Sequence, residues 1–90
     1  MLMLALAACT TGPPVQEMSD ARQAIAVARE AGAADLAPDA FSAAEAYLAS
    51  AQRKLSAKAY KQARNDAVQA KNMALDALAS AEQTTSPDPR

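Results

Sequence analysis

Apolar residues recur at helical spacing in three successive segments of the chain. The apolar positions of the first segment are Met18, Ala21, Ile25 and Ala28. They step by three or four residues and therefore share one face of a helix. Gly32 follows, and glycine commonly ends a helix because it adopts the left-handed conformation without strain. We predict a first helix over residues 17–31.

The second segment begins at Pro38. Proline is favoured at the first position of a helix, because a backbone N–H there would have no acceptor within the helix. Its apolar positions keep the same spacing and are Phe41, Ala44, Leu48, Ala51 and Leu55. We predict a second helix over residues 38–55, joined to the first by a short connection over residues 33–37.

The third segment begins at Tyr60 and predicts a helix over residues 60–83. It continues as a seam of alanines at helical spacing, namely Ala63, Ala67, Ala70, Ala74, Ala77 and Ala81. The five-residue step from Leu55 to Tyr60 would turn these two side chains about 140° apart on a single helix. A turn through residues 56–59 lets both apolar faces meet. Because no Gly or Pro marks that turn, one continuous helix over residues 38–83 is the alternative.

Alanine seams allow helix backbones to pack closely, at the short end of the usual range of about 8–10 Å. We therefore predict an all-α fold, either a small antiparallel helical hairpin or a three-helix bundle with Ala-rich seams. The Ala-rich helical domain is expected over residues 17–83. Residues 84–90 combine two prolines with Thr, Ser and Asp, and we predict a disordered tail there.

An apolar run at the N-terminus ends in the only cysteine of the sequence. The run closes with Leu6, Ala7, Ala8 and Cys9. This order is typical of a bacterial lipoprotein signal, in which signal recognition requires small residues before the cut and the cysteine thiol receives a diacylglyceryl group. We predict a cleaved signal peptide over residues 1–8, a Cys9 that carries palmitate, and a tether over residues 9–16.

The apolar run is too short to span a bilayer, which takes about 20 apolar residues. The other interpretation is a frayed core helix with a chance thiol, but the Thr, Gly and Pro residues that follow are typical of a tether. No Lys or Arg precedes the run, so the natural start is alternatively upstream of Met1. Thr10, rather than Asp, follows the cysteine; similarity to enterobacterial sorting signals then implies the outer membrane, facing the periplasm.

Large apolar residues are few. From Cys9 onward, 23 of the 82 residues are alanine, whereas Val, Ile, Leu, Met, Phe and Tyr together number 14. Burying an alanine methyl contributes far less than the ~1.5–3 kcal/mol of a large apolar side chain. We therefore expect a thin core and either marginal stability or self-association as a homo-oligomer.

The sequence offers little catalytic chemistry. It has no His or Trp, and its single Cys is assigned to lipid, so histidine metal ligands, thiolate zinc sites and nucleophile–base pairs are absent. Asp35 and Asp39 flank Pro38 at a helix start, where carboxylates favour the helix dipole. Gly12 and Gly32 form no phosphate-binding loop. We expect no enzymatic activity, no metal site and no cofactor.

The third segment also resembles the second helix of a tetratricopeptide-type hairpin. The matching positions are Tyr60, Ala63, Ala67 and Ala70. Only one such hairpin is present, whereas repeat arrays need about three to bury their faces. The resemblance implies an alternative function, an adaptor that binds a peptide or an envelope protein. A groove lined by exposed Tyr47 or Tyr60 would favour the adaptor, and a sealed alanine seam would favour a structural role.

An alanine-rich pattern extends over about residues 20–81. Its members are Ala24, Ile25, Ala28, Arg29, Ala31, Gly32, Ala33, Ala37, Pro38, Ala44, Glu45, Leu48, Ala51, Tyr60 and Ala63, with the alanines that follow. This pattern resembles the bacterial family called domain of unknown function 4398 (DUF4398). Members are typically small envelope lipoproteins or precede a peptidoglycan-binding domain. The resemblance implies an envelope location but supplies no catalytic or binding residue.

Charge is unevenly distributed along the chain. Residues 17–45 contain six acids and two bases, whereas residues 53–71 contain six bases and one acid. In an up-down-up bundle, the turn at residues 56–59 lies beside the start of the first helix and so near Cys9. We predict contact with an anionic surface by Arg53, Lys54, Lys58, Lys61 and Arg64. The alternative is a solvated face with no target.

These patterns together predict a lipid-anchored cell-envelope protein with a structural or protein-interaction role. The expected partners are the membrane, through the lipid anchor, and peptidoglycan or an envelope protein. No nucleic-acid partner is expected.

Overall fold

Three long helices and one helical turn form the fold. The computed structural model describes residues 12–85, and within this range it contains helices and no strand. The helices are α1 (Val15–Glu30), α2 (Ala33–Leu36), α3 (Pro38–Ser56) and α4 (Tyr60–Thr85). The predicted all-α fold is confirmed.

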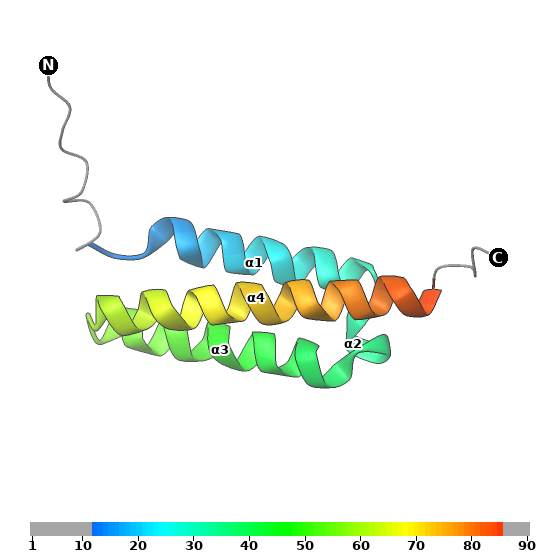
Figure 1. The fold of residues 1–90 in the computed structure, drawn as a ribbon. Helices are drawn as coiled ribbons and strands as arrows, with labels where there is room; N and C mark the ends of the chain where they lie inside the picture. The colour runs from blue at the N-terminus through cyan, green and yellow to red at the C-terminus, as the bar shows by residue number, and fades with distance from the viewer. Residues whose placement is uncertain (1–11, 86–90) are drawn as a thin grey trace, which may run out of the picture.

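α4 is the central helix of the bundle (Figure 1). It packs against both α1 and α3, whereas α1 and α3 contact each other much less. α1 and α4 run in the same direction, and α3 runs antiparallel to both. The molecule is therefore a three-helix bundle in which α4 supplies most of the interface.

The alanine seam of α4 is sealed. All six alanines are completely buried, namely Ala63, Ala67, Ala70, Ala74, Ala77 and Ala81. The large apolar side chains that are buried in the core come from the neighbouring helices and are Met18, Ile25 and Phe41. Leu48 and Leu55 of α3 are half-buried and pack at the edge of the core.

The core divides into two clusters of unequal size. The larger cluster, at the end of the bundle that carries α2, includes Ile25, Phe41 and the last three seam alanines. The smaller cluster, toward the turn between α3 and α4, contains only Met18, Ala51 and Ala67. Apolar packing is therefore concentrated at the α2 end.

Each reversal of the chain uses one residue with a left-handed backbone. Gly32 follows α1 with φ 84°, as expected of a helix-ending glycine. After α3 the corresponding residue is Lys58, with φ 63°. Its N–H donates to the Leu55 carbonyl at 2.9 Å, and the Ala59 N–H donates to the Lys54 carbonyl at 2.8 Å, the pattern of a Schellman motif. The alternative of one continuous helix over residues 38–83 is therefore wrong.

The first half of the chain differs from the prediction at two places. α1 begins at Val15, so residues 15–16 are helical rather than part of the tether. Pro14 is fully buried, and its carbonyl accepts the Met18 N–H at 2.9 Å, which starts the helix early. The connection over residues 33–37 contains α2, because the Gly32 carbonyl accepts the N–H groups of Asp35 and Leu36, each at 3.0 Å.

The last helix is longer than predicted. Residues 84–85 belong to α4 rather than to a tail, and the Thr84 hydroxyl donates to the Ser80 carbonyl at 3.0 Å. The rest of the predicted tail lies outside the described residues, as do the predicted signal peptide, Cys9 and the first two residues after it.

Candidate functional site

The start of α1 and the turn between α3 and α4 meet at one end of the bundle (Figure 1). Arg64 Nη2 donates to the Gly12 carbonyl oxygen at 2.9 Å, and Arg64 Nε lies 3.4 Å from Glu17 Oε2. One side chain near the start of α4 thus contacts both the chain before α1 and the beginning of α1. We call this the basic end, after Arg53, Lys54, Lys58, Lys61 and Arg64.

Two of these five basic residues are paired with carboxylates of the bundle. Arg64 pairs with Glu17, and Lys54 Nζ lies 2.8 Å from Asp66 Oδ2. Ser50 Oγ donates to the same Asp66 oxygen at 2.6 Å. These hydrogen bonds, that from Lys54 first, hold the pKa of Asp66 below its ordinary value of 3.8, although burial opposes the shift. Lys54 and Arg64 therefore connect helices.

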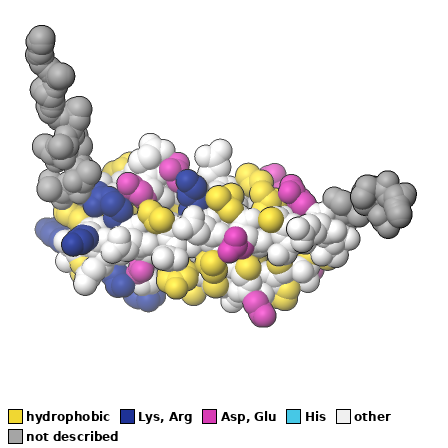
Figure 2. Space-filling model, in the orientation of Figure 1, with side chains coloured by type: hydrophobic (Ala, Val, Ile, Leu, Met, Phe, Trp, Pro, Cys, Tyr) yellow, Lys and Arg dark blue, Asp and Glu magenta, His cyan; other side chains and the backbone are white. Residues whose placement is uncertain are grey.

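The other three basic side chains are exposed. Arg53, Lys58 and Lys61 have no ion-pair partner among residues 12–85. Figure 2 shows dark blue side chains gathered at the basic end. An exposed surplus of positive charge raises the local potential and attracts anionic partners.

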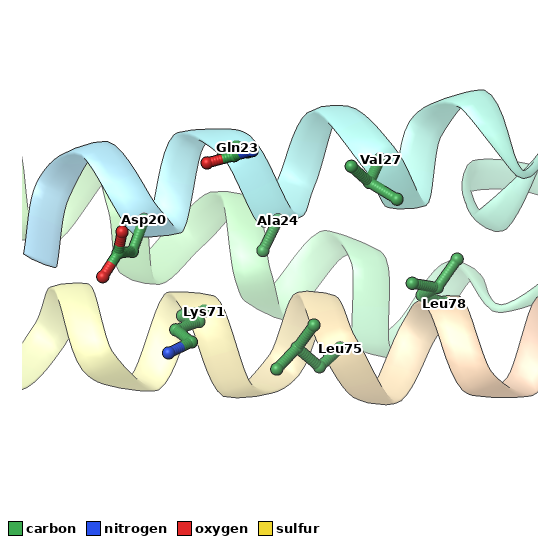
Figure 3. A pocket seen from close by; sticks show the side chains of 7 residues that line it. All are labelled: Asp20, Gln23, Ala24, Val27, Lys71, Leu75 and Leu78. Atoms are coloured by element: carbon green, nitrogen blue, oxygen red, sulfur yellow. The ribbon is translucent and has the colours of Figure 1, made fainter.

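An apolar groove runs between α1 and α4 (Figure 3). It encloses about 310 Å³ and is lined by Asp20, Gln23, Ala24, Val27, Lys71, Leu75 and Leu78. Val27 and Leu75 are each 43% exposed. Asp20 and Lys71 lie at one end of the groove and the three large apolar side chains lie toward the other. This groove was not predicted from the sequence, where its signal is a set of large apolar residues that fall outside the apolar seams.

A second hollow lies between α3 and α4, beside the Lys54–Asp66 pair. It encloses about 400 Å³ and is lined by Ala43, Ala46, Tyr47, Ser50, Lys54 and Asp66. Tyr47 is 37% exposed, whereas Tyr60 is half-buried and lies outside this lining. The sealed seam and a tyrosine-lined hollow therefore occur in the same molecule.

A family profile matches most of the chain. The profile of the family described as "Domain of unknown function (DUF4398)" matches residues 16–88, which include nearly all of α1 and the whole of α2, α3 and α4. The chain belongs to the DUF4398 family. No curated protein and no solved structure matches it.

The DUF4398 domain brings some of the predicted site residues together and not others. The five basic residues gather at one end, whereas Leu6, Ala7, Ala8 and Cys9 precede the described range. Within residues 12–85, no group of three or more His, Cys, Asp or Glu side chains is placed to hold a metal ion. None of the helices described is both long and apolar enough to cross a membrane.

Proposed function

We propose that this DUF4398 protein is a lipid-anchored component of the cell envelope with a structural or protein-interaction role and no catalytic activity. The observation that carries the proposal is the Leu6-Ala7-Ala8-Cys9 motif, whose cysteine stands three residues before Gly12, and the Gly12 carbonyl accepts a hydrogen bond from Arg64 of the bundle. A diacylglyceryl group on Cys9 would hold the helical domain directly at a membrane. Several acyl chains, at ~0.8 kcal/mol per buried CH₂, suffice for stable anchoring.

The proposed location is the outer membrane, with the domain in the periplasm. The support for this location is Thr10. The residue after the lipidated cysteine is Thr and not Asp, which by similarity to enterobacterial sorting signals favours the outer membrane. Peptidoglycan and envelope proteins are the partners within reach of a domain held there.

Replacing the anchor residue tests this proposal. Cys9→Ser removes the thiol that receives the diacylglyceryl group, so cells that express it should incorporate no radioactive palmitate into the protein. Thr11→Ser leaves the thiol intact and should label as the parent does. Fractionation of the envelope then measures the location, which we expect to be the outer membrane. Equal labelling of the parent and Cys9→Ser would contradict the anchor, and recovery with inner-membrane markers would contradict the location.

A second candidate function is an adaptor that binds a peptide or an envelope protein, and the hollow beside Tyr47 favours it. A partly exposed tyrosine next to Ser50, Lys54 and Asp66 combines an apolar ring with polar groups, as protein-binding surfaces commonly do. A photoreactive amino acid at position 47 should cross-link to one defined envelope partner, whereas the same group at the exposed Ala79 should not. Identical cross-linking patterns from the two positions would rule out this hollow as the contact surface.

A further inference from the structure

The first described residues of the chain lie at the basic end (Figure 1) and follow Cys9 closely in the sequence. The Gly12 carbonyl is held by Arg64 at 2.9 Å, Pro14 is buried, and Glu17 lies 3.4 Å from Arg64. Only Thr10 and Thr11 separate Cys9 from Gly12 in the sequence. At most residues 9–11 of the predicted tether over residues 9–16 therefore lie between the lipid and Gly12.

Covalent geometry limits how far the basic end can stand from Cys9. Three Cα–Cα steps join Cys9 to Gly12, and at ~3.3–3.6 Å per residue they span at most about 11 Å. The Debye length at physiological ionic strength is ~8 Å. Gly12 is therefore at most about one and a half Debye lengths from Cys9, and the turn between α3 and α4 lies at the same end of the bundle as Gly12 (Figure 1).

The charge of the basic end suits an anionic surface. The carboxylates in contact with its cations, Glu17 and Asp66, are paired with Arg64 and Lys54. Arg53, Lys58 and Lys61 remain exposed on the last turn of α3, the connecting turn and the first turn of α4. Because they come from consecutive segments around one turn, a single flat surface can contact all three.

We propose that the basic end rests on an anionic phospholipid surface, with Arg53, Lys58 and Lys61 against the headgroups. This inference depends on the lipid anchor proposed above, because the short tether brings this end, and not the α2 end, to the bilayer. Arg64 is a positioning residue in this arrangement: its bonds to Gly12 and Glu17 keep the tether short. The bundle then stands on the bilayer by its basic end, with α2 directed away from it.

The test uses the full lipidated protein on phosphatidylcholine vesicles and on vesicles that also contain phosphatidylglycerol, each with a trace of lipid that carries an acceptor dye on its headgroup. Because the Cys9 sulfur is consumed by the lipid, Ala57→Cys supplies a single free thiol for a donor dye at the turn. Ala79→Cys supplies the control position far along α4; both alanines are exposed.

We expect stronger energy transfer from residue 57 than from residue 79, and a further increase at residue 57 with phosphatidylglycerol at low salt. Lys58→Gln with Lys61→Gln should reduce the population of the surface-bound orientation by roughly fivefold per residue and remove that increase. Arg22→Gln with Lys71→Gln removes the same charge elsewhere on the domain and should leave the transfer unchanged.

Two results would overturn the proposal and are distinguishable. If the protein binds phosphatidylcholine vesicles but the Lys58/Lys61 variant matches the parent on phosphatidylglycerol, the basic end makes no contact, although the anchor stands. If the protein does not bind phosphatidylcholine vesicles, the lipid anchor itself fails, and the orientation that depends on it fails as well.

Discussion

The two ends of the bundle are held together by different interactions. At the α2 end, Ile25 and Phe41 pack with seam alanines in the larger apolar cluster. At the basic end, the small cluster around Met18 is supplemented by the bonds that Arg64 and Asp66 make between segments. Charge at the basic end therefore has two roles, since some of it holds the helices together and the rest remains exposed.

The difference has consequences for local stability. Burial of apolar surface contributes more than partly exposed ion pairs, and the Lys54 side chain is 41% exposed. We therefore expect the basic end to open before the α2 end, a difference that amide hydrogen exchange would measure as weaker protection around the turn at Lys58 than around Phe41.

The largest effect on stability should come from truncating a large apolar side chain in the core at the α2 end. Phe41 is 6% exposed, and Arg29 lies over its ring at 5.4 Å. Phe41→Ala should lower the free energy of unfolding by about 3–5 kcal/mol, because it leaves a cavity in the larger cluster. Tyr47→Ala on the same helix, at a 37% exposed position, should cost much less. Equal shifts of the two variants in urea denaturation would show that apolar packing is not concentrated at the α2 end.

The next effect concerns the seam that both ends share. Ala70 is completely buried on α4 between the two clusters, so Ala70→Leu should push the neighbouring helices outward and cost roughly 1–3 kcal/mol. Ala79 is exposed on the same helix and should tolerate leucine. Thermal melting of the two variants measures the difference, and coincident curves would show that the seam is not closely packed.

A smaller and pH-dependent effect is expected at the basic end. The folded-state pKa of Asp66 is lowered, so its contribution is present above the unfolded-state value near 3.8 and is lost as pH falls through the folded-state value. Asp66→Asn should cost about 1 kcal/mol at neutral pH, discounted for the exposure of Lys54, and approach the parent in acid.

The matched control for this change is Asp76→Asn, at an exposed position of the same helix. Because this position is exposed, the change should have little effect on the free energy of unfolding measured by urea denaturation. A parent–Asp66→Asn difference that stays constant from neutral to acidic pH would show that the carboxylate does not stabilise the basic end.

The smallest effects should come from the two chain reversals, with opposite signs. Gly32→Ala places an alanine at φ 84° and should cost roughly 1 kcal/mol; the added Cβ meets Leu36 Cδ1 at an ordinary 3.5 Å, so the cost is backbone strain. Lys58→Gly relieves the same strain at φ 63° and should stabilise by somewhat less than about 1 kcal/mol. Lys58→Ala keeps the backbone strain and should bring no gain. Denaturation midpoints that move in the same direction for Gly32→Ala and Lys58→Gly would show that backbone strain at these two positions does not determine the effects.

The sequence predicted the buried faces well because alanines at helical spacing have little meaning except as a packed seam. The predicted helices lie within two residues of α1, α3 and α4 at every end. The left-handed backbone of Lys58 was not predicted, because a turn without Gly or Pro carries no local signal. Only the five-residue spacing between Leu55 and Tyr60 indicated that a turn is present. The α2 turn was missed because it is set by bonds to the Gly32 carbonyl rather than by periodicity.

The candidate site was less predictable than the fold. The charge count and the predicted topology placed five basic residues at one end of the bundle. They could not show that Lys54 and Arg64 form ion pairs, because the partners Asp66 and Glu17 lie on other helices. The bond from Arg64 to Gly12 joins residues 52 positions apart, a contact that composition and spacing do not encode.

The length of α4 sets the distance between the two ends of the domain. Its 26 residues, at a rise of 1.5 Å each, extend about 39 Å from the basic end to a point beyond α2. A partner that contacts the α2 end would be met at roughly that distance from whatever surface the basic end touches. Lengthening α1, α3 and α4 by one turn each would increase this distance by about 5 Å, so the spacing can be adjusted without altering either end.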